Sequence, residues 1–373
     1  MRAISVFPSE KEIRLIEHPP PELTDPTEAR VRILEVGVCG TDRDICMFQY
    51  GTPPAGSDYL VIGHESLGEV VTVGSGVSSV KAGDLVVLMV RRPCHHQNCF
   101  ACRNGRPDFC MTGDFTERGI KEAHGYMTEY VVDDEEYLCP VPNELRDIAI
   151  LTEPLTIAEK ALTQLWQVQQ RLPWGPDQTG HPKGYRHKAL VLGAGPVGLL
   201  GAAVLLNAGF ETSVYSREVD TGTEASFIRS IGGTYYSSSI SLEDLPMRVG
   251  NIDVIFEATG VAQISFQMME VLGANGVMVF TGIPGIKGPT RMDADRIMRN
   301  MVLKNQVILG TVNAGRAPFE TAIRDLSAFK KQWPKAIRSL ITGRYPVESY
   351  REILVGLKKG IKNVLEFDEE SQT

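Results

Sequence analysis

The stretch Lys188-Ala-Leu-Val-Leu-Gly-Ala-Gly-Pro-Val-Gly198 decides the fold of this 373-residue chain. Its apolar residues Ala189–Leu192 have the pattern of a short strand, and a helical pattern follows the glycines. Gly193 permits a tight turn, Gly195 lets a backbone approach a pyrophosphate, and Gly198 allows close packing of the helix. The N-terminus of that helix attracts an anion. In this context the glycines predict dinucleotide binding rather than an ordinary turn.

The end of the next strand bears on which nucleotide is bound. Ser216 and Arg217 stand where NAD-preferring sites carry an acidic residue, and an arginine there can bind a 2′-phosphate. Glu218 could also approach the ribose, so we expect NADP to be accepted and leave NAD open. The candidate cofactor-binding residues are Gly193, Gly195, Pro196, Val197, Gly198, Ser216, Arg217, Thr259 and Gly282.

Strand and helix patterns indicate two domains. Up to about residue 150, short β runs broken by Gly, Pro and Asp predict an irregular β-barrel. Beyond Lys188, strand patterns alternate with helical ones, which predicts a doubly wound parallel sheet. We place the first domain at residues 1–155, completed by about 312–373, and the nucleotide-binding domain at 156–311.

Charge and composition exclude several classes of partner. The chain has 38 Lys and Arg against 46 Asp and Glu, without a basic run, so we expect no nucleic-acid partner. We also expect no membrane span, because no stretch approaches about 18 uninterrupted apolar residues. The start, Met1–Leu15, lacks the apolar core of a signal peptide, and a cytoplasmic location is expected. In such a reducing compartment, clustered cysteines favour metal binding over disulfides.

The segments Cys39-Gly40-Thr41-Asp42 and Gly63-His64-Glu65 each follow a β run, so a thiolate, an imidazole and carboxylates can converge from separate strand ends. Taken singly, a cysteine or a histidine is more often a packing residue than a ligand. Together these residues resemble the zinc-containing, medium-chain alcohol dehydrogenase family. Its signature is met by Gly63, His64, Glu65, Gly68, Gly74 and Val77.

This resemblance implies a GroES-like β-barrel catalytic domain and a Rossmann NAD(P)-binding domain. It implies that Cys39 and His64 bind a catalytic zinc together with Glu153, while Glu65 is a neighbouring group or an exchangeable ligand. Zinc would act as the Lewis acid for hydride transfer to the nicotinamide. The hydroxyl of Thr41 would bond the reacting oxygen and pass its proton outward, the alternative being a turn threonine. Thr41 and Glu65 are therefore the catalytic candidates.

Cys94, Cys99, Cys102 and Cys110 are separated by four, two and seven residues, and four thiolates can close a tetrahedral zinc site. The last two gaps match the structural zinc lobe of the same family. His95 and His96 lie inside the longer first gap as possible substitute ligands. A vestigial loop or adventitious disulfides are the alternatives.

The chain further resembles the archaeal-type glucose dehydrogenase branch. The matching segments are Val90-Arg91-Arg92, Glu117-Arg118-Gly119-Ile120, His124-Gly125-Tyr126-Met127, Glu153-Pro154-Leu155 and Gly310-Thr311-Val312-Asn313. This resemblance implies oxidation of an aldose, glucose first, at C1 to the aldonolactone, with Thr41, Glu117, Glu153 and Asn313 binding the sugar. Val90, Leu303 and Ile157 replace residues that can contact sugar in some members, so the aldose stays open.

Two other functions remain under consideration. One is a polyol or secondary-alcohol dehydrogenase of the same superfamily, and the other is a non-catalytic NADP-binding protein. We expect a homo-dimer or homo-tetramer, as is usual in the family. We expect the apolar strand near Val277–Phe280 to pair or to pack across a twofold axis.

Overall fold

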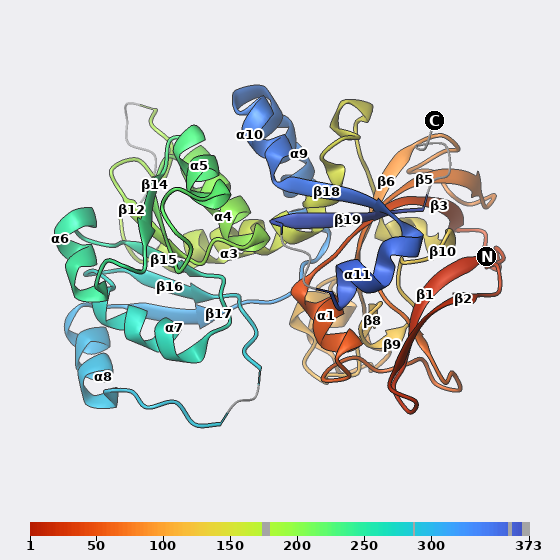
Figure 1. Cartoon of the computed structure of the whole chain (residues 1–373), viewed down its shortest axis with the longest axis horizontal. Coiled ribbons are helices and arrows are strands. Elements are labelled where there is room, and N and C mark those ends of the chain that lie inside the picture. The colour runs from red at the N-terminus through yellow and green to blue at the C-terminus, as the bar shows by residue number, and fades with distance from the viewer. Residues whose placement is uncertain (174–179, 286–287, 357–359, 368–373) are drawn as a thin grey trace. The chain divides into compact units, whose positions relative to one another are not determined.

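The computed structural model describes residues 1–173, 180–285, 288–356 and 360–367, and it divides into two compact units (Figure 1). The first comprises Met1–Thr156, Asn313–Lys331 and Ile337–Thr373. The second comprises Ile157–Val312 and Gln332–Ala336. The C-terminal part of the chain therefore returns to the first unit.

Mostly antiparallel strands build the first unit. Its largest sheet has the order β11-β6-β5-β3-β19-β18, with β10 also paired to β3, and smaller sheets join β2-β1-β4 and β7-β8-β9. The strands are β1 (Arg2–Phe7), β2 (Glu12–Glu17), β3 (Glu28–Gly37), β4 (Leu60–Val61), β5 (Glu65–Val73), β6 (Leu85–Leu88), β7 (Arg91–Arg92), β8 (Thr116–Arg118), β9 (Glu122–Ala123), β10 (Tyr130–Asp134), β11 (Leu138–Pro140), β18 (Ile341–Pro346) and β19 (Lys362–Glu366).

Strand β3 is the centre of that sheet because Ala29, Val31 and Ile33 alternate into the core. At its C-terminal end β3 pairs with β5 on one side and with β19 on the other, where Val364 lies opposite Gly37. The last strand of the chain is thus placed beside one of the first. This pairing places β19 beside the C-terminal end of β3.

The described part of this unit contains fewer helices than strands. Those within it or crossing its boundary are α1 (Gly40–Cys46), α2 (Phe100–Arg103), α3 (Thr152–Gln169), α9 (Arg316–Gln332), α10 (Pro334–Ser339) and α11 (Tyr350–Leu354). Helix α9 is amphipathic, since Phe319, Ala322, Leu326 and Phe329 recur at three- or four-residue spacing and are buried. The division between the two units falls inside α3.

The second unit contains a six-stranded sheet in the order β14-β13-β12-β15-β16-β17, and every pair in it is parallel. The strands are β12 (Lys188–Leu192), β13 (Glu211–Ser216), β14 (Thr234–Ser237), β15 (Val254–Glu257), β16 (Val277–Phe280) and β17 (Val307–Gly310). This order confirms the predicted doubly wound fold. The order reverses beside β12, and ligands bind beyond the carboxyl ends of the strands at such a reversal.

Helices cover both faces of this sheet (Figure 1). They are α4 (Pro196–Asn207), α5 (Thr223–Ser230), α6 (Leu245–Val249), α7 (Ala262–Met268) and α8 (Ala294–Leu303), together with most of α3. Leu190, Ile255 and Met278 belong to a core cluster shared with α6, α7 and α8. The alternate residues Val254 and Phe256 lie against α3 and α4 instead. Because both faces are buried, the central strands β12, β15 and β16 are apolar over most of their length.

The expectation that Val277–Phe280 pairs with a strand of a second copy is wrong. This segment is β16, and both of its edges are already paired, to β15 and to β17. A strand with two partners has no backbone groups left for a second copy. The outer strand on this side is β17.

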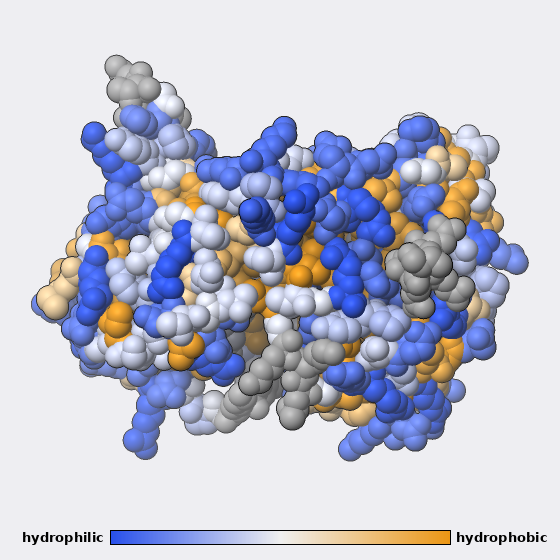
Figure 2. Space-filling model, turned by 45° about the horizontal axis from the view of Figure 1, so that its top comes forward, coloured by the Kyte–Doolittle hydropathy of each residue, from blue (hydrophilic) through white to orange (hydrophobic). Residues whose placement is uncertain are grey.

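Hydrophilic side chains dominate the face of the molecule that Figure 2 shows, with apolar side chains between them in small patches. Within the part of the chain that the structure describes, no helix combines the length and the apolar character needed to cross a membrane.

Candidate functional site

Cys39, His64 and Glu65 lie together in the first unit, and one possible ligand atom from each is within 4.8 Å of the other two. Cys39 follows β3 and caps α1, while His64 and Glu65 stand at the start of β5. Because β3 and β5 are neighbours, their adjacent ends bring the three side chains together. A thiol, an imidazole and a carboxylate form a donor set that suits zinc.

A second carboxylate, which the sequence placed in the same motif as Cys39 without assigning it a role, lies against this group. Asp42 is fully buried, with Oδ1 3.2 Å from Nδ1 of His64 and Oδ2 accepting a hydrogen bond of 2.8 Å from the backbone N–H of Cys39. Burial alone lowers the pKa of His64, but Asp42 and Cys39 raise it, and the net shift is upward. Carboxylates commonly hold metal-binding histidines in this way.

Lys362 is a residue that the sequence argument missed, and it is almost completely buried in β19. Its ammonium group donates to Oε1 and Oε2 of Glu65 at 2.7 and 2.5 Å and to the carbonyl of Val38 at 3.3 Å. Burial lowers the pKa of Lys362, but Glu65 and Cys39 raise it, and the net shift is upward. Glu65 is therefore a salt-bridged carboxylate and not an isolated ligand.

Gly37 explains why Glu65 fits beside β3. A Cβ atom on Gly37 would lie 2.2 Å from Oε2 of Glu65, so only glycine leaves room for this carboxylate.

Glu153, the expected third ligand, stands in the first turn of α3 and is not a member of the three-residue group among the described residues. Burial raises its pKa to about 7. Glu65 raises the pKa further, whereas His64 and Lys362 lower it, so the carboxyl lies within electrostatic range of the group. Thr41 lies beside the group, with its Oγ1 3.9 Å from Sγ of Cys39.

The structure brings together two of the expected sugar-binding residues. Oε1 of the buried Glu117, in β8, accepts a hydrogen bond of 2.7 Å from Nδ2 of Asn313. The same oxygen accepts from Nε and Nη2 of Arg91 at 3.0 and 2.8 Å. Arg91 also lies over the ring of Phe115, 3.7 Å from its centroid. Arg91 is thus a further polar residue of this cluster, which the sequence argument quoted only as part of a motif.

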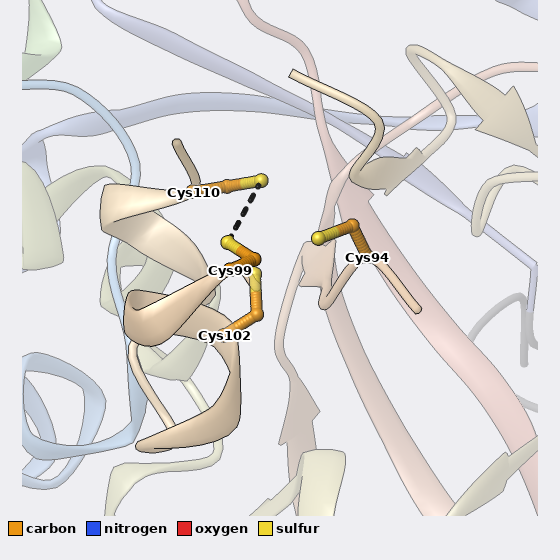
Figure 3. Close-up of side chains that lie close together, drawn as sticks. All are labelled: Cys94, Cys99, Cys102 and Cys110. Carbon is orange, nitrogen blue, oxygen red and sulfur yellow. Dashed lines mark hydrogen bonds between the residues drawn. The ribbon is translucent and has the colours of Figure 1, made fainter. Parts of the chain in front are cut away.

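The four clustered cysteines converge as Figure 3 shows, with Cys94 reaching the other three from a separate segment. Their sulfur atoms lie within 4.8 Å of one another, and Cys99 and Cys110 are 3.9 Å apart. Cys99 caps α2, Cys102 lies within it, and the N–H of Met111 donates to Cys99 at 3.5 Å. Of the alternative ligands, His96 instead contacts Asp114, at 2.5 Å. Four thiols in this arrangement suit a closed tetrahedral zinc site.

The glycine-rich turn of the second unit has the shape that a pyrophosphate needs. Gly193 has φ of 106°, and a Cβ atom on Gly198 would lie 2.2 Å from the carbonyl oxygen of Gly193. Gly195, in contrast, has open space where its Cβ would stand. Pro196 and Val197 begin α4, whose N-terminus therefore faces that space.

The other nucleotide candidates lie at the carboxyl ends of neighbouring strands. Ser216 ends β13 and is buried, whereas Arg217 is exposed and contacts Glu218 at 3.1 Å. Thr259 follows β15 and Gly282 follows β16. The backbone N–H groups of Thr259 and Gly282 both donate to the buried carboxylate of Glu257, a residue that the sequence argument did not single out.

An antiparallel unit that carries a thiol, an imidazole and a carboxylate, in a chain with a doubly wound dinucleotide sheet, defines the class of zinc-containing medium-chain alcohol dehydrogenases. Residues 25–143 match the alcohol dehydrogenase GroES-like domain, which confirms the expected fold of the first unit. Residues 146–367 match the family described as glucose dehydrogenase C-terminus. The chain belongs to the glucose dehydrogenase family of that class.

Characterised relatives match along the whole chain. Glucose 1-dehydrogenase of Methanocella arvoryzae is 38% identical, with 98% of this chain and 99% of the relative covered. Glucose 1-dehydrogenase of Thermoproteus tenax is 37% identical, with the same coverage. Among solved structures, Haloferax mediterranei glucose dehydrogenase in complex with NADP, Zn and gluconolactone has a TM-score of 0.86 and 33% identity, with 99% of each chain covered.

Proposed function

We propose that this protein is a zinc-dependent glucose 1-dehydrogenase that transfers hydride from C1 of D-glucose to NADP and forms the gluconolactone. The observation that carries the proposal is similarity to glucose 1-dehydrogenases over nearly the full chain, in a chain whose Cys39, His64 and Glu65 form one buried group. The Haloferax mediterranei enzyme, which is similar throughout, was solved with NADP, Zn and gluconolactone. The two units then correspond to a catalytic and a nucleotide-binding domain, divided near residue 156.

Cys39 and His64 would hold the catalytic zinc, with Glu153 as the third ligand and Glu65 as a neighbour held by Lys362. When bound, the zinc supplies a Lewis acid that favours loss of the proton from the C1 hydroxyl. Asp42, with Oδ1 3.2 Å from Nδ1 of His64, would help to orient the imidazole when the metal is bound. The hydroxyl of Thr41, close to Cys39, would hydrogen-bond the reacting hydroxyl and pass its own proton outward as it takes up the proton of the substrate.

Glu117 and Asn313 would bind hydroxyl groups of the sugar. The contacts of Arg91 and Asn313 all end at Oε1 of Glu117, which orients the carboxylate and offers Oε2 to a sugar hydroxyl. A site with fixed, buried polar groups rejects an analogue that lacks the matching hydroxyl, because those groups would be left unpaired. This cluster favours a polyhydroxylated substrate over a simple alcohol.

Gly193, Gly195 and Gly198 would surround the pyrophosphate at the start of α4, with Pro196 and Val197 in its first turn. Ser216 and Arg217 would bind the 2′-phosphate of NADP, since the exposed guanidinium can turn from Glu218 to a stronger anion. Thr259 and Gly282 would contact the rest of the cofactor. Cys94, Cys99, Cys102 and Cys110 would hold a second, structural zinc.

We also propose a cytoplasmic location and a homo-dimer or homo-tetramer. Helix α8 exposes the apolar side chains of Met298, Val302 and Leu303. This helix comes directly before the outer strand β17 in the sequence. Apolar exposure of this kind marks many subunit contacts.

Initial rates of NAD(P)H formation test the enzymatic proposal. D-glucose, other aldoses, sorbitol and simple alcohols are each assayed with NAD and NADP, before and after treatment with a chelator. We expect glucose to be oxidised with NADP and the rate to fall on chelation. Oxidation of sorbitol or simple alcohols alone would show that the substrate is wrong, and no oxidation of any of them would favour a non-catalytic NADP-binding protein.

A further inference from the structure

Glu257, the last residue of β15, carries a carboxylate that is only 1% exposed. Its Oε1 accepts hydrogen bonds from the N–H and hydroxyl of Thr259 at 2.8 and 2.6 Å, from the N–H of Gly260 at 2.9 Å and from the hydroxyl of Ser265 at 3.0 Å. Its Oε2 accepts from the N–H of Gly282 at 3.2 Å. All of these donors are uncharged, and they come from two different loops and from α7.

The loops that Glu257 joins are packed as closely as backbones allow. A Cβ atom on Gly282 would lie 2.1 Å from the backbone nitrogen of Gly260, and one on Gly260 would lie 2.8 Å from the carbonyl oxygen of Ile283. A Cβ atom on Gly193 would lie 2.8 Å from Cγ2 of Thr259. The turns after β12, β15 and β16 are therefore in direct contact at the carboxyl ends of three adjacent strands.

Burying a carboxylate is costly unless hydrogen bonds replace its water. A simple turn could be closed by a serine or an asparagine at lower cost. A carboxylate differs from these in accepting several bonds at once, and it offers no N–H or O–H of its own when ionised. Glu257 can therefore accept from the N–H groups of two separate loops on two different oxygens, and neither loop meets a competing donor, as it would at an amide or a hydroxyl.

We propose that Glu257 is a positioning residue for the dinucleotide. Its carboxylate holds the loops after β15 and β16 in the conformation in which Thr259 and Gly282 meet the cofactor. Glu257 acts through these loops and does not itself contact the nucleotide. This inference rests on the proposed function, since it requires that the second unit bind NADP.

The variant Glu257→Gln tests the role because it keeps the size of the side chain and replaces one acceptor oxygen by an NH2 group. If the amide oxygen takes the place of Oε1, the NH2 group faces the N–H of Gly282, and two donors cannot bond each other. We expect the Kd for NADPH, measured by calorimetry, to rise roughly tenfold, as for loss of a bond to a charged group. The KM for NADP should rise by a similar factor, while the KM for the sugar stays unchanged.

Asp253→Asn is the matched control, because Asp253 lies just before the opposite end of β15 and is also largely buried. Its oxygens accept bonds of 2.8 Å from the N–H of Lys188 and 2.7 Å from Asn251. Both variants should lower the unfolding temperature, but only Glu257→Gln should weaken NADPH binding. Equal Kd values for wild type and Glu257→Gln, or equal weakening in both variants, would overturn the positioning role.

Amide hydrogen exchange of the wild-type protein provides a second test that does not depend on a variant folding. The N–H groups of Gly260 and Gly282 should be protected to the same degree as those of β15, and rapid exchange of both would contradict the proposal. A wild-type protein that binds no NADPH would overturn the proposed function, and this inference with it. That outcome differs from failure of the positioning role alone, in which wild type and variant bind equally well.

Discussion

At the scale of single residues, the group of Cys39, His64 and Glu65 depends on one partner that is near in sequence and on one that is distant. His64 lies beside Asp42, which is three residues from Cys39, whereas Glu65 is neutralised by Lys362 in the last described strand. Buried charges of this kind are tolerated only when each has a partner. The geometry of the group is therefore as much a property of these partners as of the ligands.

Changing Cys39 to Ser should lower kcat by roughly a thousandfold or more, because the loss of Lewis-acid stabilisation is worth several kcal/mol. His64→Ala should have the same effect. Binding of NADPH should stay near the wild-type value, since Gly193–Gly198 lie in the other unit. Rates, NADPH titration and metal analysis check this, and wild-type activity in either variant would refute the zinc assignment.

His124 predicts a dependence of stability on pH. Burial, with smaller contributions from His18 and Arg118, lowers its pKa from 6.5 to about 4, and its Nδ1 accepts a hydrogen bond from Val61. The unfolded chain therefore binds more protons than the native one between these two values. The stability due to neutral His124 is complete above the unfolded pKa and is lost as the pH falls towards the folded pKa. We expect about 1 kcal/mol of loss between pH 7 and 5, allowing for partial exposure.

His124→Asn is the control for this effect, because Oδ1 of asparagine can accept the same bond from Val61 but does not titrate. Urea unfolding at the two pH values measures the free energy of unfolding of both proteins. The wild type should lose more stability on acidification than the variant, and equal losses would rule out His124 as the cause.

At the scale of elements, the cysteine lobe has little to stabilise it except its metal. Helix α2 has only four residues, and the buried cluster around it consists of the cysteines themselves with Ala101. So small a segment is not expected to hold its fold by apolar packing alone. The lobe should therefore depend on zinc for its order.

Cys102→Ser should remove about one zinc ion per chain and lower the unfolding temperature, because one ligand of the tetrahedron is lost. Cys139→Ser is the matched control, since Cys139 is buried but lies outside the group. It should leave the zinc content unchanged. Zinc analysis and thermal unfolding measure both effects in the two variants. Unaltered zinc content and unaltered stability in Cys102→Ser would count against a structural site.

At the scale of the whole molecule, the C-terminal strand completes the first unit. Strand β19 pairs with both β3 and β18, buries Val364 and Leu365, and supplies Lys362 to Glu65. Loss of this strand would open an edge of the sheet and leave a buried carboxylate without its cation.

A chain that ends after Gly360 should therefore fail to accumulate as folded protein, since it loses the pairing of β3 as well as several kcal/mol from the broken ion pair. A chain that ends after Phe367 keeps β19 and serves as the control. Soluble yield, circular dichroism and metal content compare the two. Normal folding of the shorter chain would show that β19 is dispensable.

The sequence by itself determined the features that depend on neighbouring residues. The turn at Gly193–Gly198 and the cysteine lobe are local, since their spacing already brings the groups together. Alternation of strand and helix patterns was enough to predict the doubly wound sheet, which the strand order confirms. Of the candidate metal residues, His64 and Glu65 belong to a signature of similarly short range, whereas Cys39 and Glu153 followed from the resemblance to the family.

Only the tertiary structure decided which distant segments meet. Lys362 reaches Glu65 across 297 positions of sequence, and β17 rather than β16 is the outer strand. Glu257 resembles any other residue at the end of an apolar strand until the loops around it are known. Periodicity shows that a residue is buried, but the partner of a buried charge and the order of strands depend on how the whole chain packs.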